Sequence, residues 1–391
     1  MIYFFILGNN PTLSLAELTA VLPCADGRLI NKDLFIWETD NEIVPENLIK
    51  TLGGTIKIGV FEKMVAAKQD LNEPMLALCL KVSKKSTGKF NFGISDYGQQ
   101  PLNLTPIGLT LKKKLRDAGV ASRLVTSRDK NLSSVVVEQN KLLTKGVEIV
   151  LAADGGRTLV GHTMAVQAFK DLGKRDFGRP NRDDASGMLP PKVAQMMINL
   201  AQIKDYNGLV LDPFCGSGTV LQEALLMGFN NVAGTDLSPK AIEDSKENIA
   251  WLKEKFALTG TKTNIFLKNA IKLSESFKPE SVEAIVCEPY LGPQRGWNDL
   301  KIVKDELEDL YTKALREFSK ILKPHGRVVM IFPMFFGNKP INPDYYKFEI
   351  KSSLPEEWKT NPLIKVTPRD TIVYGRAGQK VFREIVVLEK K

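Results

Sequence analysis

The sequence predicts an α/β protein in which a parallel sheet, covered by helices and ending in an antiparallel hairpin, follows a smaller α+β region. From residue 191 onward, short continuous apolar runs alternate with helical stretches, as is typical of parallel strands buried on both faces. Before residue 165, strands and helices also alternate, but in smaller units. At 391 residues, the chain is long enough for two or three domains.

The first 165 residues predict two small units. In residues 1–85, the strands YFFILG, LFIWE and IKIGVFEKMVA alternate with the helical stretches LAELTAVL and ENLIKTLG, and we expect a ferredoxin-like domain. Residues 86–165 contain the strands FNFGIS, SRLVTSR and VEIVLA, separated by the helices LTLKKKLRDAG and LSSVVVEQNKLL. Residues 166–190 are polar, basic and rich in Gly and Pro, so we expect a linker there.

Residues 191–391 predict the parallel sheet. A helix, KVAQMMINLAQI, leads into the strands GLVLDPF, NVAGTDL, TNIFLKNA and SVEAIVCEP, which helices such as TVLQEALLMG and PKAIEDSKENIAWLKEKF separate. The long helix ELEDLYTKALREFSKIL precedes the strand GRVVMIF. The final stretch, TIVYGRAGQKVFREIVVLEK, contains two strands around a glycine-containing turn, so we expect an antiparallel hairpin at one edge of the sheet.

The composition indicates which kinds of partner, metal site and compartment to expect. A net charge of +9 favours a polyanionic partner, because excess Lys and Arg supplies the sequence-independent part of nucleic-acid binding. The four cysteines are scattered and only two histidines are present, so we expect neither disulfides nor a metal site, and a reducing, cytoplasmic compartment. The apolar start MIYFFILG is too short to span a membrane, and we expect a buried strand instead.

The densest chemical motif is LVLDPFCGSGTVLQEALLMG, in which a strand ends at Asp212 and a glycine turn leads into a helix. The next strand ends at Asp236, where a carboxylate can accept both hydrogen bonds of a ribose diol. The turn lacks the third glycine of the dinucleotide pattern GxGxxG, and a GK[ST] phosphate-binding loop is absent from the sequence. The motif therefore favours an adenosine compound without phosphates, namely S-adenosylmethionine.

DPFCGSG resembles the first motif of the class I methyltransferases, which have a Rossmann-like fold, and GTDLSP resembles their second. The resemblance implies that the backbone of residues 214–219 lies against the methionine part of the cofactor. It also implies that Asp212 orients the amino group and that Asp236 holds the ribose, while Asn269 stands where the family usually has an Asp that contacts adenine. The predicted cofactor-binding residues are Asp212, Phe214, Cys215, Gly216, Gly218, Thr219, Asp236, Leu237, Asn269 and Ala270.

The stretch VCEPYLGP follows the predicted fourth strand, where such folds place the residues that contact the methyl acceptor. Enzymes that methylate exocyclic amines of bases carry Asp-Pro-Pro-Tyr-Gly there; here Glu288 keeps the acid, Pro289 keeps the first proline and Tyr290 replaces the second. A side-chain oxygen and a main-chain carbonyl that accept the amine hydrogens aim the nitrogen lone pair at the methyl group. We expect Glu288, Pro289 and Tyr290 to be catalytic, with Tyr290 or Trp297 stacking on the base. A degenerate site is the alternative.

KFNFGISDYG and LKKKLRDAGVASRLVTSRDK resemble a THUMP domain, the RNA-binding module of several tRNA-modifying enzymes. KRDFGRPNRDDASGMLPPKVAQMMINLA, LGNNPTLSLAELTAVL and YGRAGQKVFREIVVL resemble segments of the tRNA (guanine-10-N2)-methyltransferases, so the resemblance covers nearly the whole chain. The basic residues expected to contact tRNA phosphates are Lys112, Lys113, Lys114, Arg116, Arg123, Arg175, Arg179 and Arg182. The last three could equally pair with Asp176, Asp183 and Asp184.

The leading hypothesis is a cytoplasmic tRNA (guanine-N2-)-methyltransferase that uses S-adenosylmethionine, needs no metal, binds no membrane and acts on guanine 10. Two alternatives stay open. One is a tRNA-binding protein that kept the fold but lost catalysis, and the other is an amine methyltransferase that acts on rRNA or on adenine in DNA. A small activating protein subunit is compatible with this scheme, although the sequence does not require one.

Overall fold

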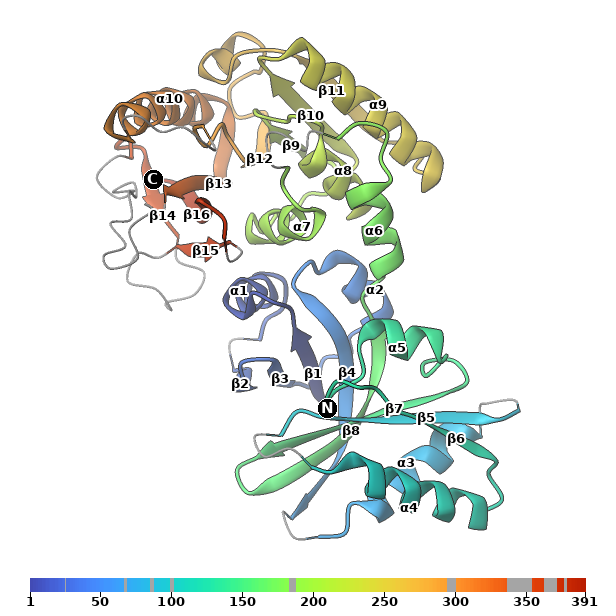
Figure 1. The fold of residues 1–391 in the computed structure, drawn as a ribbon. Helices are drawn as coiled ribbons and strands as arrows, with labels where there is room; N and C mark the ends of the chain where they lie inside the picture. The colour runs from blue at the N-terminus through green and yellow to red at the C-terminus, as the bar shows by residue number, and fades with distance from the viewer. Residues whose placement is uncertain are drawn as a thin grey trace. The chain divides into compact units, whose positions relative to one another are not determined.

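The computed structural model describes residues 1–24, 26–66, 69–84, 88–98, 102–182, 188–293, 300–335, 354–361, 371–375 and 378–391. These residues divide into two compact units, one formed by Met1–Leu15 with Cys24–Lys170 and the other by Ala16–Pro23 with Asp171–Lys391. Each unit contains an eight-stranded sheet that mixes parallel and antiparallel pairs (Figure 1).

The sheet of the first unit follows the order β2-β3-β1-β4-β8-β7-β5-β6. Its strands are β1 (Ile2–Leu7), β2 (Arg28–Asn31), β3 (Leu34–Glu38), β4 (Thr55–Ala66), β5 (Phe90–Asp96), β6 (Ser122–Val125), β7 (Gly146–Asp154) and β8 (Arg157–Val166). The helices of this part of the chain are α1 (Pro11–Val21), α2 (Pro45–Thr51), α3 (Asn72–Ser83), α4 (Leu104–Asp117) and α5 (Ser134–Gln139). Because β4 pairs with both β1 and β8, the residues of both predicted N-terminal domains share one continuous sheet. The division at residue 85 stays a prediction.

A fully buried ion pair lies in the middle of this sheet. Lys57 of β4 lies 2.5 Å from Glu148 of β7, and neither side chain is exposed. The hydroxyls of Ser95 and Thr163 each donate to the Glu148 carboxylate at 2.6 Å, and the Lys57 ammonium also donates to the main-chain oxygen of Leu132. These hydrogen bonds to both charged groups offset part of the cost of burying them.

Helix α4 carries the basic run of the first unit on its outer side. Leu111 and Leu115, one turn apart, are fully buried in a core with side chains of β5 and β7. Lys112, Lys113 and Arg116 fall on the other side of the helix and are exposed. The helical period therefore separates an apolar face from a cationic face.

The sheet of the second unit follows the order β11-β10-β9-β12-β13-β16-β14, and β15 also pairs with β16. Its strands are β9 (Leu209–Asp212), β10 (Asn231–Asp236), β11 (Lys262–Leu267), β12 (Val282–Cys287), β13 (Leu322–Phe335), β14 (Trp358–Thr360), β15 (Ile372–Tyr374) and β16 (Val381–Lys390). The strands from β11 to β13 in this order are parallel, whereas β16 runs antiparallel to β13, β14 and β15. The predicted fold class and the predicted C-terminal hairpin are confirmed.

Helices cover the second sheet on both faces. The helices of this part of the chain are α6 (Phe169–Phe177), α7 (Pro191–Leu200), α8 (Thr219–Leu226), α9 (Pro239–Lys255), the 3-10 helix η1 (Ala270–Glu275) and α10 (Leu300–Ile321). Tyr311, Leu315 and Phe318 of α10 share a buried core with Ile285 of β12 and Val328 of β13. Neighbouring strand residues point to the opposite face, where α7 and α8 pack against each other.

Helix α6 lies inside the stretch for which the sequence predicted a linker, residues 166–190. Its buried residues are Leu172 and Arg175. The sequence did not predict this helix because only one of its apolar side chains is buried, so the periodicity that normally reveals a helix is weak.

Candidate active site

Three acidic residues lie at the carboxyl edge of the second sheet. β9 ends at Asp212, β10 ends at Asp236, and β12 ends one residue before Glu288. These ends are neighbours because the three strands are parallel and adjacent in the order β10-β9-β12. Burial raises the pKa of Asp212 well above its ordinary value, and the carboxylates of Asp236 and Glu288 raise it further. The fold thus places the predicted cofactor-binding acids, Asp212 and Asp236, near the predicted catalytic acid, Glu288.

The glycine turn between β9 and α8 has a backbone that other residues would not adopt easily. Gly216 and Gly218 have φ angles of +49° and +84°, in the left-handed region. A Cβ atom on Gly218 would also lie 2.5 Å from the hydroxyl oxygen of Ser245. The main-chain N–H of Cys215 donates to the carbonyl of Thr235 at 2.9 Å, which ties the turn to the end of β10.

Backbone N–H groups fix the two cofactor acids. The Asp236 carboxylate accepts from the N–H of Gly216 at 3.0 Å through Oδ2 and from that of Ser238 at 2.9 Å through Oδ1. The Asp212 Oδ1 accepts from the N–H of Phe214 at 3.1 Å. Each carboxylate oxygen has two lone pairs, so Asp236 keeps one on each oxygen for a diol.

The remaining predicted cofactor residues surround this edge. Leu237, which follows Asp236, is 65% exposed. Asn269 caps the amino end of η1, and its Oδ1 accepts from the N–H of Ile271 at 3.1 Å, so one of the two lone pairs of this oxygen is already used. Cys215 is buried, and burial raises the pKa of its thiol. A buried, protonated thiol is not a nucleophile, so Cys215 can line the site without taking part in the chemistry.

Glu288 is paired with an arginine that the sequence did not point to. Arg383 of β16 donates from Nε to Glu288 Oε1 at 2.5 Å and from Nη2 to Oε2 at 3.4 Å. The side chains are only 10% and 15% exposed. Burial raises the pKa of Glu288, and the charge and hydrogen bond of Arg383 oppose that rise. The only sequence signal for this pair is an arginine inside the apolar run VFREIVVL.

The two residues after Glu288 differ in exposure. Pro289 is buried, whereas the side chain of Tyr290 is exposed. The main-chain oxygen of Tyr290 accepts a hydrogen bond of 2.6 Å from the hydroxyl of Tyr311 on α10. Tyr311 in turn packs edge-on against Phe332 of β13. An ordered backbone thus presents an aromatic ring at this edge; Trp297, the other predicted stacking residue, lies outside the described residues.

Two of the arginines predicted to contact RNA are buried in the second unit. The guanidinium of Arg175 on α6 makes two hydrogen bonds, of 2.7 and 3.0 Å, to the buried carboxylate of Glu223 on α8. Arg179 is also buried, and it donates at 2.7 Å to the hydroxyl of Thr219, the first residue of α8. Both side chains therefore attach the start of this unit to the helix that follows the glycine turn.

A third contact joins the same stretch to the turn itself. The side-chain amide of Asn248 on α9 donates to the main-chain oxygens of Asn181 and Ser217, at 3.0 and 2.9 Å. Its oxygen accepts from the N–H of Asn181 at 3.0 Å. The guanidinium of Arg182 lies 5.0 Å from the ring centre of Phe177, whose side chain is exposed.

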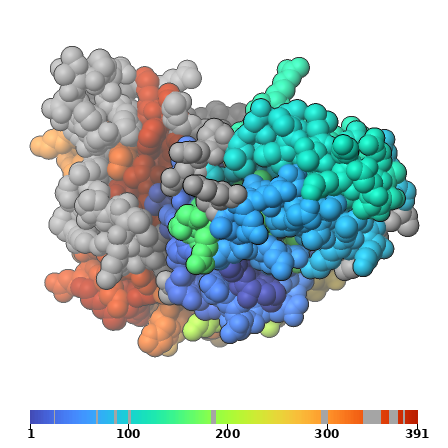
Figure 2. Space-filling view, turned by 90° about the horizontal axis from the view of Figure 1, so that it is seen from below, coloured from blue at the N-terminus to red at the C-terminus, as the bar shows by residue number. Residues whose placement is uncertain are grey.

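The predicted basic residues of the first unit lie at its surface. Lys112, Lys113, Arg116 and Arg123 are exposed, and Lys114 forms an ion pair with Glu73. Residues near position 115, teal in the colour scale, contribute to the outer surface in Figure 2. These residues are placed to meet a polyanion, unlike the buried arginines of the second unit.

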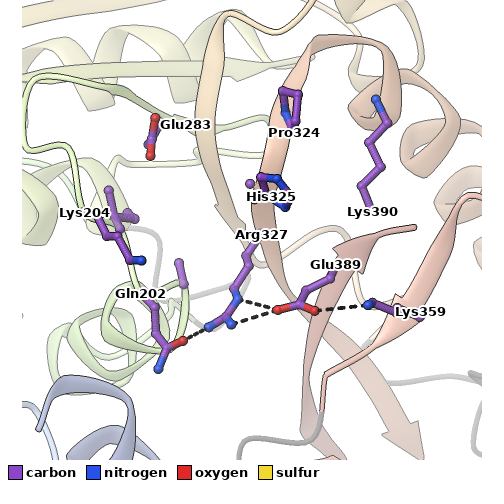
Figure 3. A pocket seen from close by; sticks show the side chains of 12 residues that line it. Gln202, Lys204, Glu283, Pro324, His325, Arg327, Lys359, Glu389 and Lys390 are labelled. Atoms are coloured by element: carbon purple, nitrogen blue, oxygen red, sulfur yellow. Dashed lines mark hydrogen bonds and ion pairs between the residues drawn. The ribbon is translucent and has the colours of Figure 1, made fainter. Parts of the chain in front are cut away.

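A polar pocket in the second unit lies at the opposite, amino edge of the sheet (Figure 3). It is lined by the start of β12 at Glu283, the first part of β13 up to Arg327, and the end of β16 at Glu389. Arg327 and Lys359 both pair with Glu389, at 2.8 and 3.7 Å. Because ligands of open α/β sheets bind at the carboxyl ends of the strands, this pocket is separate from the candidate active site.

A family model and several curated proteins match part of this chain. Residues 179–335 match the family model of the RMKL-like methyltransferase domain (UPF0020). The tRNA (guanine(10)-N2)-dimethyltransferase of Pyrococcus abyssi is 32% identical over 164 residues, which are 42% of each chain. The protein of that name from Methanothermobacter thermautotrophicus is 26% identical over 196 residues, 50% of this chain and 52% of the relative. The chain therefore spans about half the length of the curated relatives it matches.

Solved structures also align over the whole chain. The crystal structure of TrmN from Thermus thermophilus aligns over 100% of both chains with a TM-score of 0.55 and 19% sequence identity, which supports the fold. The strand order and the glycine turn agree with the similarity of residues 179–335 to the RMKL-like methyltransferase domain.

Proposed function

We propose that this protein transfers a methyl group from S-adenosylmethionine to the exocyclic N2 of a guanine in tRNA, with guanine 10 as the expected target. The observation that carries the proposal is the placement of Glu288 beside Asp212 and the glycine turn, at the carboxyl edge of a methyltransferase sheet. The names of the relatives, tRNA (guanine(10)-N2)-dimethyltransferase, support the choice of guanine and of tRNA.

The residues at this edge fit S-adenosylmethionine. The carboxylate of Asp236 is held by two backbone N–H groups and retains acceptor capacity for a ribose diol. The left-handed Gly216 and Gly218 let the backbone approach a ligand closely without side chains. When bound, the cofactor supplies an electrophilic methyl group attached to a sulfonium ion.

Glu288 and the neighbouring backbone would activate the target amine. An exocyclic amine is a weak nucleophile because its lone pair is delocalised into the ring, and acceptors for its hydrogens favour a pyramidal nitrogen. The N2 lone pair forms the new N–C bond while the C–S bond breaks and its electron pair stays on sulfur. The nitrogen then loses one proton, which Glu288 is placed to accept. The exposed ring of Tyr290 is available to stack on the base.

The basic face of α4 would contact the tRNA backbone. Lys112, Lys113 and Arg116 are exposed on one side of this helix, as phosphate contact requires. We leave Arg175 and Arg179 out of the proposed RNA contacts because their guanidinium groups are buried in the second unit. Cytoplasmic location stays a prediction, and the scheme stays compatible with a small activating subunit that the sequence does not require. No helix in the described part of the chain has the length and apolar character of a membrane span.

Replacing Asp236 with Ala should weaken the binding of S-adenosylmethionine. Each charge-assisted hydrogen bond from a ribose hydroxyl contributes about 1.5–3 kcal/mol, and the variant loses up to two. Isothermal titration calorimetry measures the loss, with Asp309→Ala as a control because Asp309 is an exposed acid on α10 that pairs with Lys313. Equal affinity of parent and Asp236→Ala would remove Asp236 from the cofactor site.

Replacing Lys112, Lys113 and Lys114 together with Gln should weaken tRNA binding and flatten its salt dependence. The slope of log K against log salt should fall by up to about one unit per lost phosphate contact. A variant that removes three exposed lysines of the second unit, Lys246, Lys255 and Lys262, loses the same charge elsewhere and is the control. If filter binding gives both triple variants the slope of the parent, the α4 face is only solvated surface.

Replacing Glu288 with Ala should slow methyl transfer by roughly a hundredfold to a thousandfold, since it removes a transition-state contact worth about 2.7–4 kcal/mol. Single-turnover transfer to unmodified tRNA is the measurement. Affinities for S-adenosylmethionine and for tRNA should change little, which separates loss of chemistry from loss of fold. A rate equal to that of the parent would exclude Glu288 from catalysis.

A further inference from the structure

The contacts between Arg383 and Glu288 are unequal. Arg383 Nε lies 2.5 Å from Oε1, whereas Nη2 lies 3.4 Å from Oε2, a long distance for a charge-assisted hydrogen bond. Oε1 is therefore held firmly by β16, and Oε2 is engaged only weakly. A carboxylate has about four lone-pair sites, so the pair leaves Glu288 with capacity to accept further hydrogens.

Within the part of the chain that the structure describes, three other titratable groups interact electrostatically with Glu288, and none of them carries a positive charge. They are Asp212 at the end of β9, Cys287 at the end of β12 and Tyr311 on α10. Asp212 is an acid, and the thiol and the phenol are buried with pKa values raised well above their ordinary values. Among these neighbours, Arg383 is the cation.

We infer that Arg383, by holding Glu288 as a carboxylate with two acceptor oxygens, makes the active site select guanine over bases with an adenine-like or cytosine-like edge. This inference rests on the proposed function and adds a residue that determines which base is methylated. Arg383 is a positioning residue in this scheme, because it acts on the base through Glu288.

The selection follows from the hydrogen-bonding edges of the bases. Guanine presents two adjacent donors, N1–H and an N2 hydrogen, and an ionised carboxylate accepts both. Adenine presents an N6 hydrogen beside the N1 lone pair, and cytosine presents an N4 hydrogen beside the N3 lone pair. A carboxylate oxygen facing such a lone pair is repelled, whereas a protonated carboxyl or an amide would pair with it. The charge state of Glu288 therefore sets the hydrogen-bond pattern that the site accepts.

The ion pair with Arg383 also explains how the site can use Glu288 at a position where related motifs have an Asp. Glu has one more methylene and one more rotatable bond, so its carboxylate is harder to hold in one position. The contact with Arg383 on a neighbouring part of the sheet removes that freedom. The longer side chain then extends further from the end of β12, where it can meet two donors of one base.

The test compares two tRNAs that differ at the nucleotide the parent methylates, one carrying guanine and the other 2,6-diaminopurine. The analogue keeps the N2 amine but replaces N1–H with a lone pair. The parent should prefer guanine by about a hundredfold or more, as sites built for a donor reject analogues that lack it. Glu288→Gln, whose amide offers one acceptor and one donor, should reverse this preference or reduce it at least tenfold.

Substitutions of Arg383 test the positioning role. Arg383→Met should reduce the guanine preference at least tenfold, whereas Arg383→Lys, which keeps a positive charge, should retain more of it. Arg327→Met is the matched control, since it removes another arginine–carboxylate pair between β13 and β16 at the opposite edge (Figure 3). Arg327→Met should prefer guanine over 2,6-diaminopurine as strongly as the parent does. For a slow variant, the preference is the ratio of its single-turnover rates on the two tRNAs, measured over long incubations.

The two possible failures are distinguishable. If the parent methylates guanine tRNA but Glu288→Gln and Arg383→Met both keep its preference, the inference is overturned and the proposed function stands. If the parent methylates neither tRNA, the proposed function itself is wrong. If Arg327→Met loses the guanine preference as fully as Arg383→Met does, the loss reflects general destabilisation of the sheet. The inference about the Glu288–Arg383 pair is then also overturned.

Discussion

The arrangement of the second unit depends on one constraint: adjacent parallel strands end at the same edge of a sheet. Because β10, β9 and β12 are neighbours, the acids that end or follow them must share this edge. Three carboxylates in a partly buried site repel one another, and the raised pKa of Asp212 reflects that repulsion as well as burial. Backbone N–H groups that donate to Asp236 offset this repulsion there, and the ion pair with Arg383 offsets it at Glu288.

The position of Arg383 gives the antiparallel strand β16 a role at this edge. β16 pairs with β13 over nine residue pairs, from Arg327 opposite Glu389 to Phe335 opposite Val381. Because β16 runs against the parallel strands, its amino end lies at their carboxyl edge, and Arg383 is the third residue from that end. The same strand carries Glu389 to the opposite edge, where it pairs with Arg327. A single strand thus contributes a cation to one edge and an acid to the other.

Much of this architecture was predictable from local sequence, and the reasons differ between features. Alternating apolar and helical runs predicted the parallel sheet and the hairpin, and the pattern DPFCGSG predicted the turn that Gly216 and Gly218 form.

The Glu288–Arg383 pair was not predictable, because its members are 95 positions apart and meet only through the strand order. Arg175 was assigned to RNA as one of several basic residues near the joint between the two predicted regions, and its ion-pair partner, Glu223, lies 48 positions further along the chain in an apolar helix. Strands β2 and β8 and helix α3 were also missed, since short or half-exposed elements give weak periodicity.

The measurement that tests the central claim most directly is the identity of the methylated nucleoside. Unmodified tRNA is incubated with the full-length protein and isotopically labelled S-adenosylmethionine, digested to nucleosides and analysed by mass spectrometry. The account predicts label in N2-methylguanosine or N2,N2-dimethylguanosine, at a single position of the tRNA. Label in a methylated adenosine or cytidine, or a tRNA that binds but gains no label, would contradict it.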